Sequence, residues 1–180
     1  MKKTLLGLLS LILVCACAHD ANVISSHSLL PVPQDMQTTK GHFTVSEGTK
    51  LYIGAPADDK IAIANAIAAW SGLLEATEEK ATANCIAMEI CDNVANVTSP
   101  EGYTINVTKD RVDVKATSAA GLFYAAQTLQ QLADGGNTIP TCTITDEPEF
   151  AYRGLMLDVS RHFFGKEFIK KQIDAMAHFK

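Results

Sequence analysis

The fold class of this chain is decided by the stretch Phe150-Ala151-Tyr152-Arg153-Gly154-Leu155-Met156-Leu157-Asp158-Val159-Ser160-Arg161-His162-Phe163-Phe164. Its centre, residues 154–160, is a nearly continuous apolar run broken by Asp158, which is typical of a strand covered on both faces. After Gly165, apolar residues recur at the spacing of a helix, at Ile169, Ile173, Met176 and Ala177. A strand, a short loop and a helix in this order indicate the first βα unit of a (β/α)8 barrel.

The two arginines of this stretch are expected to have different roles. Chemistry in such barrels takes place at the carboxyl ends of the strands, and Arg161 leaves the predicted strand there, about 25 Å from Arg153 at about 3.3 Å per residue. Arg161 is the candidate binding residue, because its planar guanidinium holds several donors in fixed directions and stays charged. Arg153 is expected to make structural contacts. Asp158 is expected either to orient Arg161 or to pair with other barrel residues, and His162 to pack beside the site.

Residues 28–146 predict a small α+β domain ahead of this unit. Short strands are expected at 41–45, 49–54, 85–90 and 139–144. The clearest signal is a hairpin over 103–116, in which apolar and polar residues alternate on both arms, as in an antiparallel sheet covered on one side. The pattern therefore predicts a two-layer sandwich of one sheet and its helices.

Two helices are predicted in this domain. Asp58 and Asp59 favour the start of the first helix, and an apolar stripe continues through Ile63, Ile67, Trp70 and Leu74. This spacing favours a core position for Trp70 over a role as a sugar platform. Ser118 is the predicted cap of the second helix, which is expected to end at Gly135-Gly136.

Two separate motifs resemble the family 20 glycoside hydrolases, the β-N-acetylhexosaminidases. The run from Phe150 to Phe164, which includes Asp158-Val159-Ser160-Arg161-His162, resembles the first barrel strand of that family. Glu101-Gly102-Tyr103 together with residues 119–132 resembles the non-catalytic domain that precedes the barrel in bacterial members. The resemblance implies a non-catalytic domain at 28–146 and the start of a catalytic barrel, cut short, at 147–180. It also implies that Arg161 binds hydroxyls of a sugar, with Asp158 and His162 supporting it.

The resemblance implies an exo-acting enzyme that removes terminal β-linked N-acetylglucosamine or N-acetylgalactosamine with retention. The substrate's own acetamido oxygen acts as the nucleophile in this family, which departs from the usual scheme of two carboxylates. An adjacent Asp-Glu pair does the remaining chemistry, and its place in the family lies beyond Lys180. Glu147, Glu149 and Glu167 do not match this pair, so no catalytic residue is expected in this chain and the chain alone is expected to be inactive.

Two other functions remain open at this point. Residues 28–146 could act as a carbohydrate-binding or accessory module without catalysis, or the barrel could serve another glycan. The expected partner of a β-N-acetylhexosaminidase is a glycan that contains N-acetylhexosamine. No cofactor is expected.

Residues 1–18 predict a secretion signal. Lys2 and Lys3 precede an apolar run of about ten residues, which is shorter than the about 20 residues of a membrane-spanning helix. Ala16-Cys17 resembles a bacterial lipobox, so Cys17 is the candidate for a lipid anchor, with ordinary signal cleavage as the alternative. The expected location is outside the cytoplasm of a bacterium, in the periplasm, at the outer membrane or on the cell surface.

Charge and cysteine content exclude several further classes. A net charge of −5 gives no basic surface for nucleic acid. The lysines at 166, 170, 171 and 180 are expected on a solvated helix face. Cys85, Cys91 and Cys142 are expected as buried free thiols, because no metal-ligand spacing is present and Cys85 and Cys91 lie too far apart on one strand to bridge.

Overall fold

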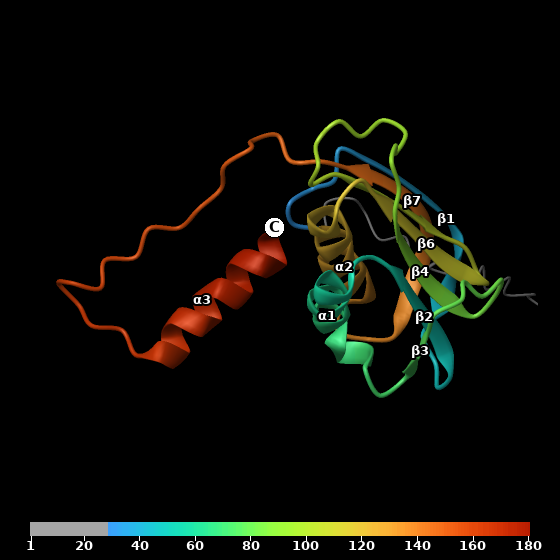
Figure 1. The fold of residues 1–180 in the computed structure, drawn as a ribbon, viewed down its shortest axis with the longest axis horizontal. Coiled ribbons are helices and arrows are strands. Elements are labelled where there is room, and N and C mark those ends of the chain that lie inside the picture. Colours follow the sequence, from blue (N-terminus) through green and yellow to red (C-terminus); the bar gives the residue numbers. More distant parts are fainter. Residues whose placement is uncertain (1–28) are drawn as a thin grey trace, which may run out of the picture.

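The computed structural model describes residues 29–180, which form one mixed sheet with helices α1 and α2 on one of its faces (Figure 1). The predicted signal and Cys17 lie outside the described residues. The strands are β1 (Asp35–Thr44), β2 (Thr49–Gly54), β3 (Leu74–Thr77), β4 (Cys85–Ile90), β5 (Tyr103–Val107), β6 (Arg111–Ala116) and β7 (Thr138–Asp146). The helices are α1 (Ala57–Ala66), α2 (Ala119–Ala133) and α3 (Lys166–Phe179), with a 3-10 turn over Ala68–Trp70.

The sheet has seven strands in the order β1-β7-β5-β6-β4-β2-β3. Pairs are antiparallel from β1 to β6 along this order and parallel from β6 to β3. Parallel neighbours need a crossover connection, and α1 supplies one between β2 and β3. Helix α2 links β6 to β7 and packs against β4, β5, β6 and β7, so it is the central element of the second layer.

The predicted hairpin is confirmed as β5 and β6, and its alternation decides which face the helices cover. Tyr103, Ile105 and Val107 are buried, whereas Asn106 and Lys115 are exposed on the opposite face. Burying an apolar side chain of this size contributes about 1.5–3 kcal/mol. The two-layer architecture expected for this part of the chain is therefore present, as a mixed sheet with three helices in the described chain.

The first predicted helix is shorter than its apolar stripe. Helix α1 ends at Ala66, Trp70 lies in the 3-10 turn, and Leu74 begins β3. The prediction that Leu74 continues the helix was wrong, because residues 74–77 hydrogen-bond with the edge of β2. The core position of Trp70 is confirmed: its side chain is 2% exposed and its indole nitrogen donates to the oxygen of Gly136 over 2.8 Å.

Helix α2 begins at a close approach between two glycines. The Ser118 hydroxyl accepts a hydrogen bond from the nitrogen of Gly121, as an N-cap does. A Cβ atom on Gly121 would lie 2.5 Å from the oxygen of Gly102 and 2.8 Å from the Cβ of Ala116. Only a glycine at position 121 lets the first turn of α2 rest on the start of β5.

Replacing Gly121 by Ala tests this close approach. Helix propensity alone predicts a gain of up to about 1 kcal/mol for Ala over Gly. The clash predicts a loss instead, of about 1–3 kcal/mol, because backbone has to move. We expect the urea midpoint of unfolding to fall. Gly72→Ala is the matched control, since Gly72 also lies in the small domain and a Cβ there meets nothing within 4 Å. A raised midpoint for Gly121→Ala would contradict the packing described above.

Residues 147–165 leave the small domain as an extended excursion, and α3 returns toward α2 (Figure 1). The expected helix is confirmed as α3, but the expected strand at 154–160 is not formed. A strand needs neighbours for its backbone donors and acceptors, and none of the seven strands of the described chain lies beside this segment. Large apolar side chains of this part stay exposed, among them Tyr152, Met156, Phe163, Ile173 and Met176.

Candidate functional site

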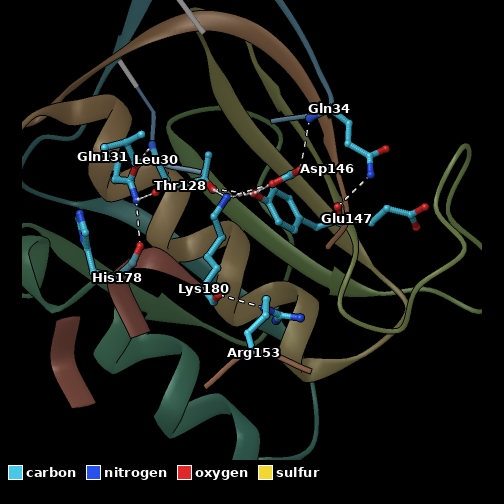
Figure 2. Close-up of polar contacts among 10 residues, drawn as sticks. Leu30, Gln34, Thr128, Gln131, Asp146, Glu147, Arg153, His178 and Lys180 are labelled. Atoms are coloured by element: carbon cyan, nitrogen blue, oxygen red, sulfur yellow. Dashed lines mark hydrogen bonds and ion pairs between the residues drawn. The ribbon is translucent and has the colours of Figure 1, made fainter. Parts of the chain in front are cut away.

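A buried polar cluster lies where β5, β7, α2 and the end of α3 meet (Figure 2). Tyr103, Thr128 and Asp146 form what we call the lysine socket. The ammonium nitrogen of Lys180 lies 2.8 Å from the Tyr103 hydroxyl, 3.1 Å from the Thr128 hydroxyl and 3.0 Å from Asp146 Oδ2. The side chains of Lys180 and Asp146 are only 8% and 11% exposed. A charged pair at this depth needs partners for all of its polar atoms.

The strand register builds the socket. Tyr103 begins β5 and pairs directly with Asp146 at the end of β7. The Tyr103 hydroxyl donates to Asp146 over 2.7 Å, and it lies 2.6 Å from the hydroxyl of Thr128 in α2. Burial raises the pKa of Tyr103 well above its ordinary value, with the Asp146 charge adding to the effect. Tyr103 therefore stays a neutral donor in the folded protein.

The position of Lys180 corrects an expectation from the sequence. Lys166, Lys170 and Lys171 are exposed on α3, as expected of a solvated face, whereas the Lys180 side chain is buried. Burial lowers the pKa of the Lys180 ammonium, and Asp146 opposes this by stabilising the charge. Helical spacing alone could not distinguish Lys180 from the other lysines, because its environment comes from strands that are distant in sequence.

Arg153 makes a second set of contacts beside the socket. Its guanidinium donates to Glu101 over 2.8 Å and to the Tyr124 hydroxyl over 3.3 Å. It also lies 5.6 Å from the centre of the Tyr124 ring, within reach of a cation–π interaction. Its Nε donates to the backbone oxygen of Lys180 over 3.1 Å (Figure 2). Arg153 thus ties the start of the excursion both to the small domain and to the end of α3.

The adjacent acids Asp146 and Glu147 are both engaged in structural bonds. Glu147 accepts hydrogen bonds from the backbone nitrogens of Thr98 and Ser99, over 2.6 and 2.8 Å, and from the Thr98 hydroxyl. The backbone bonds hold the pKa of Glu147 below its ordinary value. Asp146 pairs with Lys180. The two carboxylates therefore anchor a loop and a helix end.

Glu147→Gln is expected to remove part of the pH dependence of folding. Because the pKa of Glu147 is lower in the folded state, its stabilisation is present above the ordinary carboxyl pKa and is lost as the pH falls through the lowered value. We expect wild type to be more stable than Glu147→Gln near pH 7 and equal to it in strong acid. The urea midpoints of unfolding, determined from pH 7 to pH 3, measure this difference. Glu149→Gln, at an exposed neighbouring residue, is the control. Parallel curves for wild type and Glu147→Gln would contradict it.

The candidate binding residues lie on the excursion, away from the socket. The Arg161 side chain is 86% exposed, and its Nε lies 3.5 Å from Asp158 Oδ2. The other oxygen of Asp158 accepts from the backbone nitrogens of Ser160 and Arg161, over 2.9 and 3.1 Å. His162 is exposed beside them. The structure thus brings Asp158 and Arg161 together in a tight turn that faces solvent, with His162 next in the chain.

A cavity of about 350 Å³ lies beside the socket. Four of its charged side chains are paired with one another, Arg153 with Glu101 and Lys180 with Asp146. It is lined by Pro31, Val32, Gln34, Glu101, Tyr103, Tyr124, Asp146, Glu147, Pro148, Glu149, Phe150, Arg153 and Lys180. Its cations are therefore already engaged with carboxylates, and most of the remaining surface is apolar.

Other kinds of site were sought in the described chain. No group of His, Cys, Asp and Glu side chains within residues 29–180 is arranged to hold a metal ion. Over the same residues, no helix combines the length and apolar character needed to cross a membrane. Cys85 and Cys142 are buried free thiols, as expected, whereas Cys91 is only partly buried.

The comparison with known protein families agrees with this architecture. Residues 26–147 match the family model described as glycosyl hydrolase family 20, domain 2, and residues 150–180 match the catalytic domain of the same family. The chain belongs to glycosyl hydrolase family 20. Two adjacent parts of one family match in chain order, and their boundary falls directly after the Asp146-Glu147 pair.

Individual members of family 20 match most of the chain but exceed it in length. A β-hexosaminidase of Porphyromonas gingivalis is 35% identical over 85% of the chain, which spans 21% of that protein. The N,N'-diacetylchitobiase of Vibrio harveyi is 31% identical over 86% of the chain, which spans 17% of it. The solved structure of a Streptomyces plicatus N-acetyl-β-hexosaminidase matches with a TM-score of 0.73 at 26% identity, covering 87% of the chain and 33% of that structure.

Proposed function

We propose that this chain forms the amino-terminal part of an exo-acting β-N-acetylhexosaminidase, which removes terminal β-linked N-acetylglucosamine or N-acetylgalactosamine from glycans. One observation carries the proposal: residues 150–180, which hold Asp158 and Arg161, match the catalytic domain of family 20. The printed names of the relatives support it, since they are β-hexosaminidases and a chitobiase. A Streptomyces plicatus member binds N-acetylglucosamine as product.

Arg161 has the role of holding the sugar in this proposal. Its guanidinium donates to hydroxyls of the N-acetylhexosamine, and Asp158 restricts its side chain from the preceding turn. Retaining hydrolysis then proceeds with the substrate's own acetamido oxygen as nucleophile. In this proposal the general acid comes from the part of the catalytic domain beyond Lys180, since Glu147, Glu149 and Glu167 do not match the Asp-Glu pair of the family.

The alternative of a carbohydrate-binding module has less support. Such modules commonly stack a sugar on an exposed aromatic ring, and within residues 29–146 every Phe, Tyr and Trp side chain is buried or partly buried, with Trp70 in the core. Its indole nitrogen is also bonded to Gly136, so the ring is not available to a ligand.

The proposal is tested by hydrolysis of a chromogenic N-acetylglucosaminide. A longer protein, in which the segment that begins at residue 150 continues into the rest of a family 20 catalytic domain, is expected to release the chromophore, whereas residues 1–180 alone are not. The chain alone supplies 31 residues matched to the catalytic domain, residues 150–180, out of the about 250 that a barrel needs. Release by the purified chain above a vector control would overturn the second expectation, and no release by the longer protein would overturn the function.

Arg161→Ala in the longer protein tests the assigned residue. Each lost charge-assisted hydrogen bond is worth about 1.5–3 kcal/mol. At about 1.36 kcal/mol per decade, losing one or two of them lowers kcat/KM roughly tenfold to ten-thousandfold. Arg161→Lys should recover part of this, because it restores the charge without the planar fork. Lys171→Ala, at an exposed position of α3, is the control. Near wild-type turnover in Arg161→Ala would refute the assignment.

We also propose that the protein is exported from the cytoplasm and that a lipid on Cys17 anchors it to a membrane of the cell envelope. Support comes from the sequence of residues 1–18 alone. A clickable fatty acid is expected to label the wild-type protein and not Cys17→Ser, because serine cannot form the thioether. Equal labelling of the two proteins would place the lipid elsewhere, and absence of label in both would favour ordinary cleavage of the signal.

A further inference from the structure

Both ends of the catalytic-domain segment are held at one place on the small domain. Arg153, at its start, binds Glu101 and Tyr124, and Lys180, at its end, enters the lysine socket. The two ends also contact each other through the bond from Arg153 Nε to the backbone oxygen of Lys180. Residues 154–165, which include the turn with Arg161, run away from the small domain before α3 returns toward α2 (Figure 1).

Within the described chain, helix α3 makes few other contacts with the small domain. None of its residues is buried, and its exposed side chains include Phe168, Ile173 and Met176. Its last turn makes the polar contacts: the Gln131 amide donates to the backbone oxygen of His178 over 2.9 Å, and the Lys180 ammonium follows directly (Figure 2). Among the described residues, the position of α3 on the small domain therefore depends on the polar contacts of its last turn and of Lys180.

We propose that Lys180 is a positioning residue: by occupying the lysine socket, it fixes the end of α3 on the small domain and thereby sets the orientation of the turn that carries Asp158 and Arg161. This inference rests on the proposed function, because the turn matters only if Arg161 holds a sugar. It gives the small domain a part in catalysis through geometry rather than through contact with substrate.

The lysine socket suits this role because it binds a single ammonium group at one defined position. Three oxygens from β5, β7 and α2 converge on the ammonium, so Lys180 satisfies its three N–H donors only at this point. Withdrawing it would leave the Asp146 carboxylate buried without a cation, which is strongly unfavourable. Lys170, by contrast, pairs with Glu167 on its own helix, so that exposed pair places no constraint on where α3 sits.

Chemical labelling of the 180-residue chain tests the seat without any substitution. Under brief treatment with an acylating reagent, Lys180 is expected to react about tenfold or more slowly than Lys170, because the reagent reaches a buried amine only through local opening. The side chains are 8% and 53% exposed. Mass spectrometry of the separated peptides gives both rates in one sample. Equal rates would show that the socket is empty in solution and would overturn the proposal.

Kinetics in the protein with a complete catalytic domain test the positioning. Lys180→Met is expected to lower kcat/KM about tenfold or more, since small displacements of binding groups have effects of this order. Lys170→Met is the matched control and should leave kcat/KM unchanged. The same Lys180→Met change in an Arg161→Ala background should have an effect of less than about twofold, because the two residues act through one interaction.

A purely structural role gives a different result. If Lys180→Met only weakened folding, it would lower kcat/KM by the same factor with and without Arg161, and that outcome would overturn the proposal. Lys180→Arg keeps the positive charge and replaces Lys180→Met in the test if the latter fails to fold. We expect Lys180→Arg to retain more activity than Lys180→Met. Its effect on kcat/KM should likewise be smaller in the Arg161→Ala background. Absence of hydrolysis by the unsubstituted protein would refute the proposed function instead, while labelling still decides whether Lys180 is seated.

Discussion

A carboxylate buried at the end of a strand needs a cation, and Asp146 obtains one from Lys180, 34 residues later in the chain. Desolvation penalises both charges, and the pair persists because the Tyr103 and Thr128 hydroxyls complete its hydrogen bonds. Four elements contribute to this one contact. The end of β7, the start of β5, the middle of α2 and the residue after α3 must therefore be in place together.

The junction between the two segments that match family 20 follows directly after this contact. Asp146 and Glu147 are adjacent, but their bonds run in different directions. Asp146 faces the helical layer and Lys180, and Glu147 holds the 98–99 loop through two backbone nitrogens. The chain leaves the sheet at these two residues. The excursion of residues 147–165 therefore begins where both carboxylates are hydrogen-bonded to other parts of the chain.

Local patterns predicted most of the small domain because its elements carry their own signals. The alternation of Tyr103, Ile105 and Val107 has one structural solution on a half-buried sheet, and Ser118 caps α2 through an interaction that spans three residues. Leu74 shows where such patterns fail. The apolar stripe remains helical as far as Trp70, but pairing with β2 places Leu74 in a strand. A short window of sequence does not reveal that pairing.

The candidate site divides along the same line. The contact between Asp158 and Arg161 spans three residues, so spacing alone could suggest it, and the structure places the two side chains together. A strand at 154–160 needs a neighbouring strand on each side. Its apolar run indicates such surroundings, but it does not identify the segments that would pair with it. The lysine socket depends on the register that sets Tyr103 opposite Asp146, so no property of residues 166–180 by themselves could separate Lys180 from the solvated lysines.

The two motifs that resemble family 20 in the sequence are in contact with each other in space. Glu101 and Tyr124 belong to the first motif and Arg153 to the second, and they are joined by an ion pair, a hydrogen bond and a cation–π contact. The same first motif supplies Tyr103 and Thr128 to the socket. These residues face the segment that matches the catalytic domain, not the polar outer face of the sheet. Much of what makes the first motif recognisable is therefore the surface on which the start of the catalytic domain is held.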